Sequence, residues 1–91
     1  MSYRPGEITT AKLNRAFPFK VDIPCPRGGL GRRGITMRIW CRERCVAGAW
    51  DERPHEVREY GQAPVQCVRL FFEDSIFARD FRDAFGGTLR E

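Results

Sequence analysis

The pattern of apolar residues predicts an α+β fold, a two-layer sandwich with both helices on one face of an antiparallel sheet. Segments that are apolar at every second position and segments with a helical apolar stripe follow one another as β, α, β, β, α, with a short last strand as an option. Strands with one apolar face and helices with one apolar stripe are satisfied by a single shared core. This is the split βαβ, or ferredoxin-like, arrangement, and a different spatial order of the same elements is the alternative.

The chain has 91 residues, of which 42% are hydrophobic, and this size predicts one globular domain. Residues 1–16 mix proline, glycine, threonine and charge without a period, which predicts a loosely ordered N-terminal arm before an α+β domain at 17–91. No apolar run approaches the length of about 18 residues that a membrane span needs, and the first residues hold no apolar signal core. We therefore expect a cytoplasmic protein without membrane contact.

Two segments alternate clearly enough to predict strands. The first strand spans residues 17–23 and places one set on a buried face: Phe17, Phe19, Val21 and Ile23. The second spans residues 65–73, with the even-numbered Val68, Leu70 and Phe72 directed to the core. The odd-numbered Cys67, Arg69 and Phe71 then lie on the open face of the sheet.

Two segments have helical periodicity. A helix from about Leu30 to Cys45 has a core-facing stripe made by Leu30, Gly34, Met37, Cys41 and Cys45. A second helix follows Glu73-Asp74-Ser75 as its N-cap, ends at Gly86-Gly87, and has an apolar stripe made by Phe77, Ala78, Phe81, Ala84 and Phe85. The predicted core of the domain is Phe19, Val21, Met37, Cys41, Val68, Leu70, Phe72, Phe77 and Phe81.

The segment between the first helix and the second clear strand is less decided. Residues 47–50 are small and weakly patterned, and a strand is plausible because the chain must return across the core. Residues 53–61 fit either one helical turn, with Pro54 in its first position and Gly61 as its stop, or one limb of a hairpin. Residues 88–90 form a short last strand or a frayed end.

Positive charge is concentrated between Arg27 and Arg44. This stretch holds six arginines and one acid, so it alone carries +5, whereas the whole chain carries +4. Arginine pairs with phosphate and carboxylate through two parallel hydrogen bonds, which suits an anion-binding surface. A codon bias toward arginine explains the same composition without any function. The predicted contact residues for an anionic partner are Arg27, Arg32, Arg33, Arg38, Arg42 and Arg44.

A second predicted interface consists of Trp40 on the first helix and of Arg69 and Phe71 on the open sheet face. An aromatic residue beside basic residues on such a face is how some RNA-binding domains stack bases. The segment VQCVRLFFED lacks the glycine and the paired aromatics of that motif. We therefore favour a protein interface, which also offers a surface for a homodimer.

Cofactor and catalytic signatures are absent from the sequence. The loop RGGLGRRG has neither the spacing of a phosphate-binding P-loop nor that of a dinucleotide fingerprint. The four cysteines (Cys25, Cys41, Cys45 and Cys67) contain no C-x-x-C pair, and strand alternation turns Cys67 away from the two helical cysteines. The single histidine, His55, has no spacing that pairs it with a nucleophile. We expect no metal, no cofactor and no enzymatic activity.

The sequence thus predicts a small, non-catalytic binding or regulatory module that contacts an anionic partner through its arginine-rich loop and helix. Nucleic acid is the first partner to consider because the charge is local and strongly positive. The alternative is a protein–protein module, such as a small adaptor or an inhibitor encoded by a phage or mobile element, that recognises an acidic protein surface.

Overall fold

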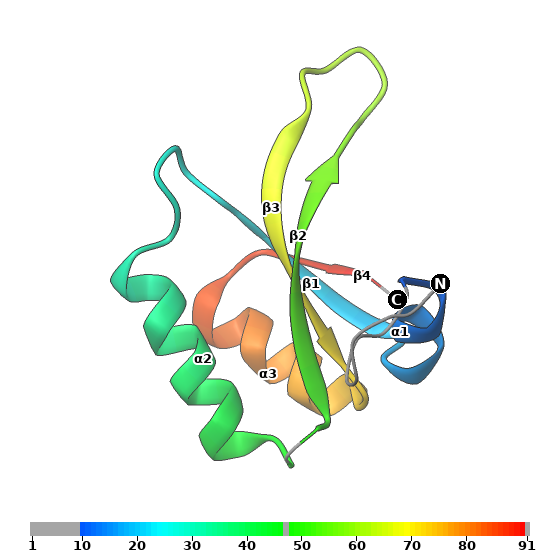
Figure 1. The fold of residues 1–91 in the computed structure, drawn as a ribbon, viewed down its shortest axis with the longest axis vertical. Coiled ribbons are helices and arrows are strands. Elements are labelled where there is room, and N and C mark those ends of the chain that lie inside the picture. The colour runs from blue at the N-terminus through cyan, green and yellow to red at the C-terminus, as the bar shows by residue number, and fades with distance from the viewer. Residues whose placement is uncertain (1–9, 47, 91) are drawn as a thin grey trace, which may run out of the picture.

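The computed structural model describes residues 10–46 and 48–90 of the chain (Figure 1). In chain order the elements are α1 (Thr10–Ala16), β1 (Phe19–Pro24), α2 (Arg32–Arg44), β2 (Trp50–Val57), β3 (Val65–Phe72), α3 (Ser75–Phe85) and β4 (Thr88–Arg90). The four strands form one antiparallel sheet in the order β2-β3-β1-β4. Helices α2 and α3 cover the same face of this sheet. The predicted two-layer α+β fold is confirmed, and the optional last strand is formed.

One hydrophobic core lies between the sheet and the two helices. Strands β1 and β3 contribute Val21, Ile23, Leu70 and Phe72. The helices contribute Met37, Cys41, Ala78 and Phe81, and Cys45 joins them from the C-cap of α2. The ring of Phe81 lies 5.4 Å from that of Phe72 and 4.8 Å from that of Phe85, measured between centroids. All nine predicted core residues belong to this cluster, either buried or packed against it. The periodicity of the sequence therefore identified the core correctly.

The ends of the helices follow from local backbone chemistry. Helix α2 begins at Arg32, two residues after the predicted start, because Gly28, Gly29 and Gly31 all have positive φ angles that a helix does not accept. Its buried side is the predicted one, with Gly34, Met37 and Cys41 turned inward. Helix α3 is capped by Asp74, whose side chain accepts a hydrogen bond of 2.8 Å from the amide of Ile76.

Strands β2 and β3 form a hairpin that projects from the body of the protein (Figure 1). Residues 53–57 are therefore strand, which decides between the two predicted forms of the 53–61 segment. Pro54 lies opposite Val68 on an outer strand of the sheet. An outer strand tolerates proline because one edge of its backbone needs no ladder hydrogen bonds.

The N-terminal part of the described chain departs from the predicted pattern. Strand β1 begins at Phe19, and Phe17 does not continue its inward face but packs on Phe71 in a separate small cluster. Residues 10–16 form a helix although they show no apolar period, and residues 1–9 lie outside the described residues. The division into an arm at 1–16 and a domain at 17–91 stays a prediction.

The turn between α3 and β4 depends on a glycine. Gly87 has a φ angle of 95°, and a Cβ atom added there would lie 2.6 Å from the backbone oxygen of Asp22. A side chain at this position would hold β4 away from β1. Gly87 thereby brings Arg90, on β4, alongside β1.

The helices were also compared with the length and hydropathy of a membrane-spanning segment. Across residues 10–46 and 48–90, no helix combines the length and the apolar character needed to cross a bilayer.

Replacing Phe81 by alanine tests the core. We expect Phe81→Ala to lower the free energy of unfolding by about 3 to 5 kcal/mol, because it empties the space between Phe72 and Phe85. The control is Ile76→Ala on the same helix, whose side chain is 63% exposed and whose loss should change stability by no more than about 0.5 kcal/mol. Urea unfolding measures both, and equal losses would contradict this description of the core.

Candidate functional site

The six predicted arginines are carried by helix α2 and the loop before it. We call Arg27, Arg32, Arg33, Arg38, Arg42 and Arg44 the basic surface. All six are exposed, because burial of the Gly34, Met37 and Cys41 stripe turns the remaining sides of α2 outward. Exposure alone does not make them available to a partner, since several of them bind other parts of this chain.

The side of α2 that faces α3 is held by contacts within the protein. Arg33 donates a hydrogen bond through Nη2 to the backbone oxygen of Phe85, at the end of α3. Trp40 packs edge-on against Phe81 and Phe85, with centroids 5.5 and 6.1 Å apart. The guanidinium carbon of Arg44 lies 5.3 Å from the centre of the Trp40 ring. Arg33 and Trp40 therefore join α2 to α3, whereas Arg44 stacks on the Trp40 ring within α2.

The opposite side of α2 faces strand β2. Arg38 forms an ion pair with Glu52 of β2, with 2.5 Å between Nε and Oε1. This contact neutralises one charge of the basic surface and links α2 to the sheet. A partner that used Arg38 would have to compete with Glu52.

The outward side of the basic surface is different in character. The side chains of Arg27, Arg32 and Arg42 have no hydrogen-bond or ion-pair partner within residues 10–46 and 48–90. Between Arg32 and Arg42 lie two isoleucines one helical turn apart, Ile35 and Ile39, which are 55% and 45% exposed. We call Arg32, Ile35, Ile39 and Arg42 the α2 outer face. Sequence reasoning missed the isoleucines, although their four-residue spacing off the core stripe was visible.

The open sheet face corrects one prediction. Phe71 does lie on the face away from the helices, but it is only 3% exposed because Phe17 covers it. The predicted exposure of Phe71 is therefore wrong. The chain before β1 folds back over this part of the sheet, and no alternation within β3 could have indicated that.

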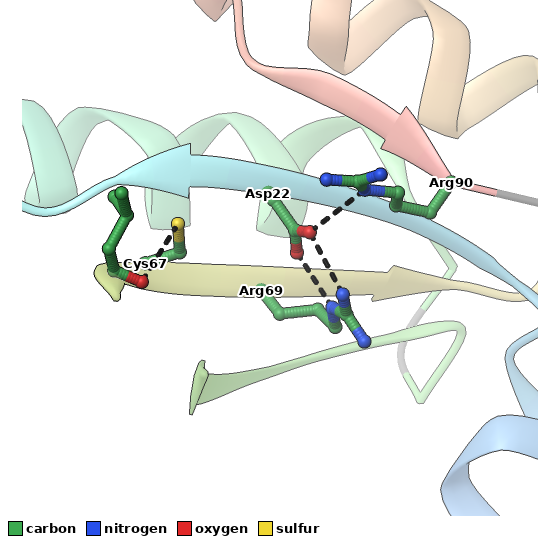
Figure 2. A network of polar contacts seen from close by, with 5 residues as sticks. Asp22, Cys67, Arg69 and Arg90 are labelled. Carbon is green, nitrogen blue, oxygen red and sulfur yellow. Dashed lines mark hydrogen bonds and ion pairs between the residues drawn. The ribbon is translucent and has the colours of Figure 1, made fainter. Parts of the chain in front are cut away.

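Arg69, the other predicted residue of this face, binds a buried carboxylate. Asp22 on β1 is 3% exposed and receives hydrogen bonds from Nε and Nη2 of Arg69 at 2.6 and 2.9 Å. Arg90 on β4 adds a third contact, with 3.3 Å between Nε and Oδ2. Figure 2 shows the carboxylate between the two guanidinium groups. Three strands are thus joined across the open face by one charge.

The environment of Asp22 decides its ionisation. Burial by itself would raise the pKa of the carboxyl group, but the hydrogen bonds and attraction of Arg69, with a further bond from Arg90, hold this pKa below its ordinary value of 3.8. Asp22 is therefore a carboxylate at neutral pH. Its negative charge offsets one of the two arginine charges and leaves the other.

The cysteines do not assemble into a reactive or metal-binding group in the described part. Cys41 and Cys45 belong to the core, whereas Cys67 lies on the open face, as strand alternation predicts. Burial raises the pKa of the Cys41 thiol to about 12, so it stays protonated at neutral pH. Among residues 10–46 and 48–90, no three cysteine, histidine or acidic side chains are grouped as metal ligands would be.

Comparison of the chain with protein-family models, with curated proteins and with solved structures finds no match.

Substitution of Asp22 tests the buried ion pair through pH. Asp22→Asn should lower the free energy of unfolding by about 1 to 3 kcal/mol at pH 7, because it removes a charged acceptor from two arginines. Because the pKa of Asp22 is lower in the folded protein than its ordinary value of 3.8, the ionised carboxylate stabilises the folded state at pH values above 3.8. This stabilisation is lost as the pH falls through the folded-state pKa. The gap between the parent and the variant should therefore close below about pH 4.

Urea unfolding across this pH range measures the gap. Asp83→Asn is the control, because Asp83 pairs with Arg82 on the surface of α3 and its side chain is 69% exposed. Its effect should stay small at every pH. A gap for Asp22→Asn that does not change with pH would contradict the role assigned to the carboxylate.

Proposed function

We propose that this protein is a non-catalytic binding module that recognises an acidic protein surface through the α2 outer face. The observation that carries the proposal is the exposure of Ile35 and Ile39 between Arg32 and Arg42, two arginines without partners in the described part of the chain. An apolar centre flanked by arginines is the composition found in protein–protein interfaces.

The positive charge around the α2 outer face favours a partner with a negatively charged surface. Arg32 and Arg42 belong to a segment of net positive charge, and Arg27 adds to it from the loop before the helix. Because Arg33, Arg38 and Arg44 already have contacts within the chain, these three remaining arginines supply the charge that a partner meets. A complementary partner presents carboxylates around an apolar patch, for instance one face of an acidic amphipathic helix.

Nucleic acid is the second candidate, favoured by the same three unpaired arginines and by the net charge of +4. Two features weigh against it. Phosphate-binding surfaces are polar and strongly basic, whereas the α2 outer face has an apolar centre. Phe71 is buried, so the open sheet face lacks the aromatic platform for stacking bases that the sequence suggested.

The module is proposed as non-catalytic, and the three buried thiols support this because they are poor nucleophiles. Burial raises the pKa of Cys41, Cys45 and Cys67 alike, so none of the three is poised as a thiolate at neutral pH.

Photo-crosslinking tests the protein partner directly. With p-benzoylphenylalanine in place of Ile39, we expect a covalent adduct in cells of the source organism that protease removes and nuclease does not. The same probe in place of Ile76, an exposed isoleucine on α3, is the control and should give no such adduct. Adding Arg32→Ala and Arg42→Ala should abolish the adduct, because the partner is held by charge as well as by apolar contact.

An adduct that nuclease removes would show that the partner is nucleic acid and would contradict the proposed protein partner. In that case each of Arg32→Ala and Arg42→Ala should reduce the slope of the logarithm of the nucleic-acid binding constant against log[salt] by about 0.7 to 0.9. Ile35→Ala should change this slope little. Undetectable binding to mixed single- and double-stranded DNA and RNA at low salt would reject nucleic acid. Equal adducts from positions 39 and 76 would reject the α2 outer face as the contact surface.

A further inference from the structure

The open sheet face contains a hollow to which every strand of the sheet contributes a cationic or hydrogen-bonding side chain. Lys20 of β1, His55 of β2, Arg69 of β3 and Arg90 of β4 line one open cavity of about 470 Å³. All four side chains are half-buried rather than fully solvated. The hollow lies on the opposite side of the sheet from α2, so it is separate from the α2 outer face.

The pairing of strands places like charges opposite each other on this face. Lys20 lies directly opposite Arg90, and Arg53 lies directly opposite Arg69. Like charges in directly opposed positions destabilise a sheet. Asp22 and Asp51 offset part of the repulsion, the latter at 3.5 Å from Arg53. Both members of the Lys20–Arg90 pair line the hollow, so an anion bound there would relieve the repulsion between them.

Several donors of the hollow are left over after the internal contacts are made. Arg69 uses Nε and Nη2 for Asp22, and Arg90 uses only Nε. A guanidinium group has five N–H donors, so both retain donors for a further acceptor. The side chain of Lys20 has no hydrogen-bond or ion-pair partner among residues 10–46 and 48–90. Asp22 holds the two guanidinium groups in place, which reduces the entropy that they would lose on binding a ligand.

The carboxylates at the rim oppose this charge only in part. Glu56 is bound by Arg58 at 2.7 Å and by Gln66 at 2.9 Å, so its charge is already matched. Glu59, which also lines the cavity, is exposed to solvent and adds one negative charge. Lys20, Arg69 and Arg90 thus carry three positive charges against the carboxylates of Asp22 and Glu59, so the hollow stays positive.

We propose that this hollow binds the phosphate group of a small phosphomonoester. Arginine and lysine are the side chains that recognise phosphate, the former through paired hydrogen bonds. A volume of about 470 Å³ lies within the range of small-molecule sites. Because Phe17 covers Phe71, the Phe71 ring is not open to a ligand, and Lys20, Arg69 and Arg90 recognise the ligand through its phosphate group.

The neighbouring cavity indicates the rest of the ligand. It has a volume of about 170 Å³ and shares Val57, Glu59 and Arg90 with the first. Its other lining residues are polar on one part, with hydrogen-bonding groups, and apolar on the rest: Asp22, Gln62 and Thr88, and Pro24, Ala63, Val65 and Cys67. Such a lining suits a compact body with hydroxyl groups, so the class of ligand is a sugar or polyol phosphate.

Titration with three probes tests the site: inorganic phosphate, ribose 5-phosphate and ribose. We expect the two phosphate compounds to shift the NMR signals of Lys20, His55, Arg69 and Arg90, with ribose 5-phosphate binding more tightly and ribose not binding. Lys20→Gln should weaken binding roughly tenfold, the worth of one charged contact. Arg42→Gln removes the same charge from α2 and should have no effect.

The results that overturn the proposal are distinct from those that bear on the α2 outer face. Ribose binding as tightly as ribose 5-phosphate, equal weakening by Lys20→Gln and Arg42→Gln, or no shift at millimolar phosphate would each reject the site. Because Lys20 has no partner in the described chain, its variant should keep the parent circular dichroism spectrum. If it unfolds, Arg90→Gln replaces it under the same criteria.

Discussion

The contacts of the whole sheet depend on one constraint, which is that helices cover only one face of the central strands β1 and β3. On that face α2 and α3 bury Val21, Leu70 and Phe72 in the usual way. On the other face no layer of helices is available, yet Phe71 and Asp22 are both almost fully buried. The chain protects them by two devices: Phe17 covers Phe71, and two arginines enclose the Asp22 carboxylate.

These devices divide the arginines of the protein by role. Arg33 joins α2 to α3, Arg38 joins α2 to β2, and Arg44 stacks on Trp40 within α2. Arg69 and Arg90 join neighbouring strands through Asp22. A buried charge with its hydrogen bonds satisfied fixes geometry more than it adds stability. The arginines left over on α2 surround exposed isoleucines, and those of the sheet face surround a hollow. The protein therefore presents two cationic surfaces of unlike character on opposite sides.

Much of the fold was predictable because its elements are strongly periodic. Alternation in 65–73 fixed which face of β3 is buried, and the stripe through Met37 and Cys41 fixed the inward side of α2. The start of α2 was misplaced by two residues, since the apolar period extends through Leu30 although the neighbouring glycines adopt positive φ angles. The helix at residues 10–16 was not foreseen because it has no apolar period of its own.

The sequence by itself determined the order of the elements, the core and the concentration of charge between Arg27 and Arg44, because these follow from spacing along one chain. Only the tertiary structure decided which arginines are engaged, since Glu52, the Phe85 carbonyl and Asp22 are distant in sequence from the residues that they bind. It also decided that Phe71 is covered and that four strands share one hollow. Contacts between distant segments depend on packing, and local periodicity carries no record of them.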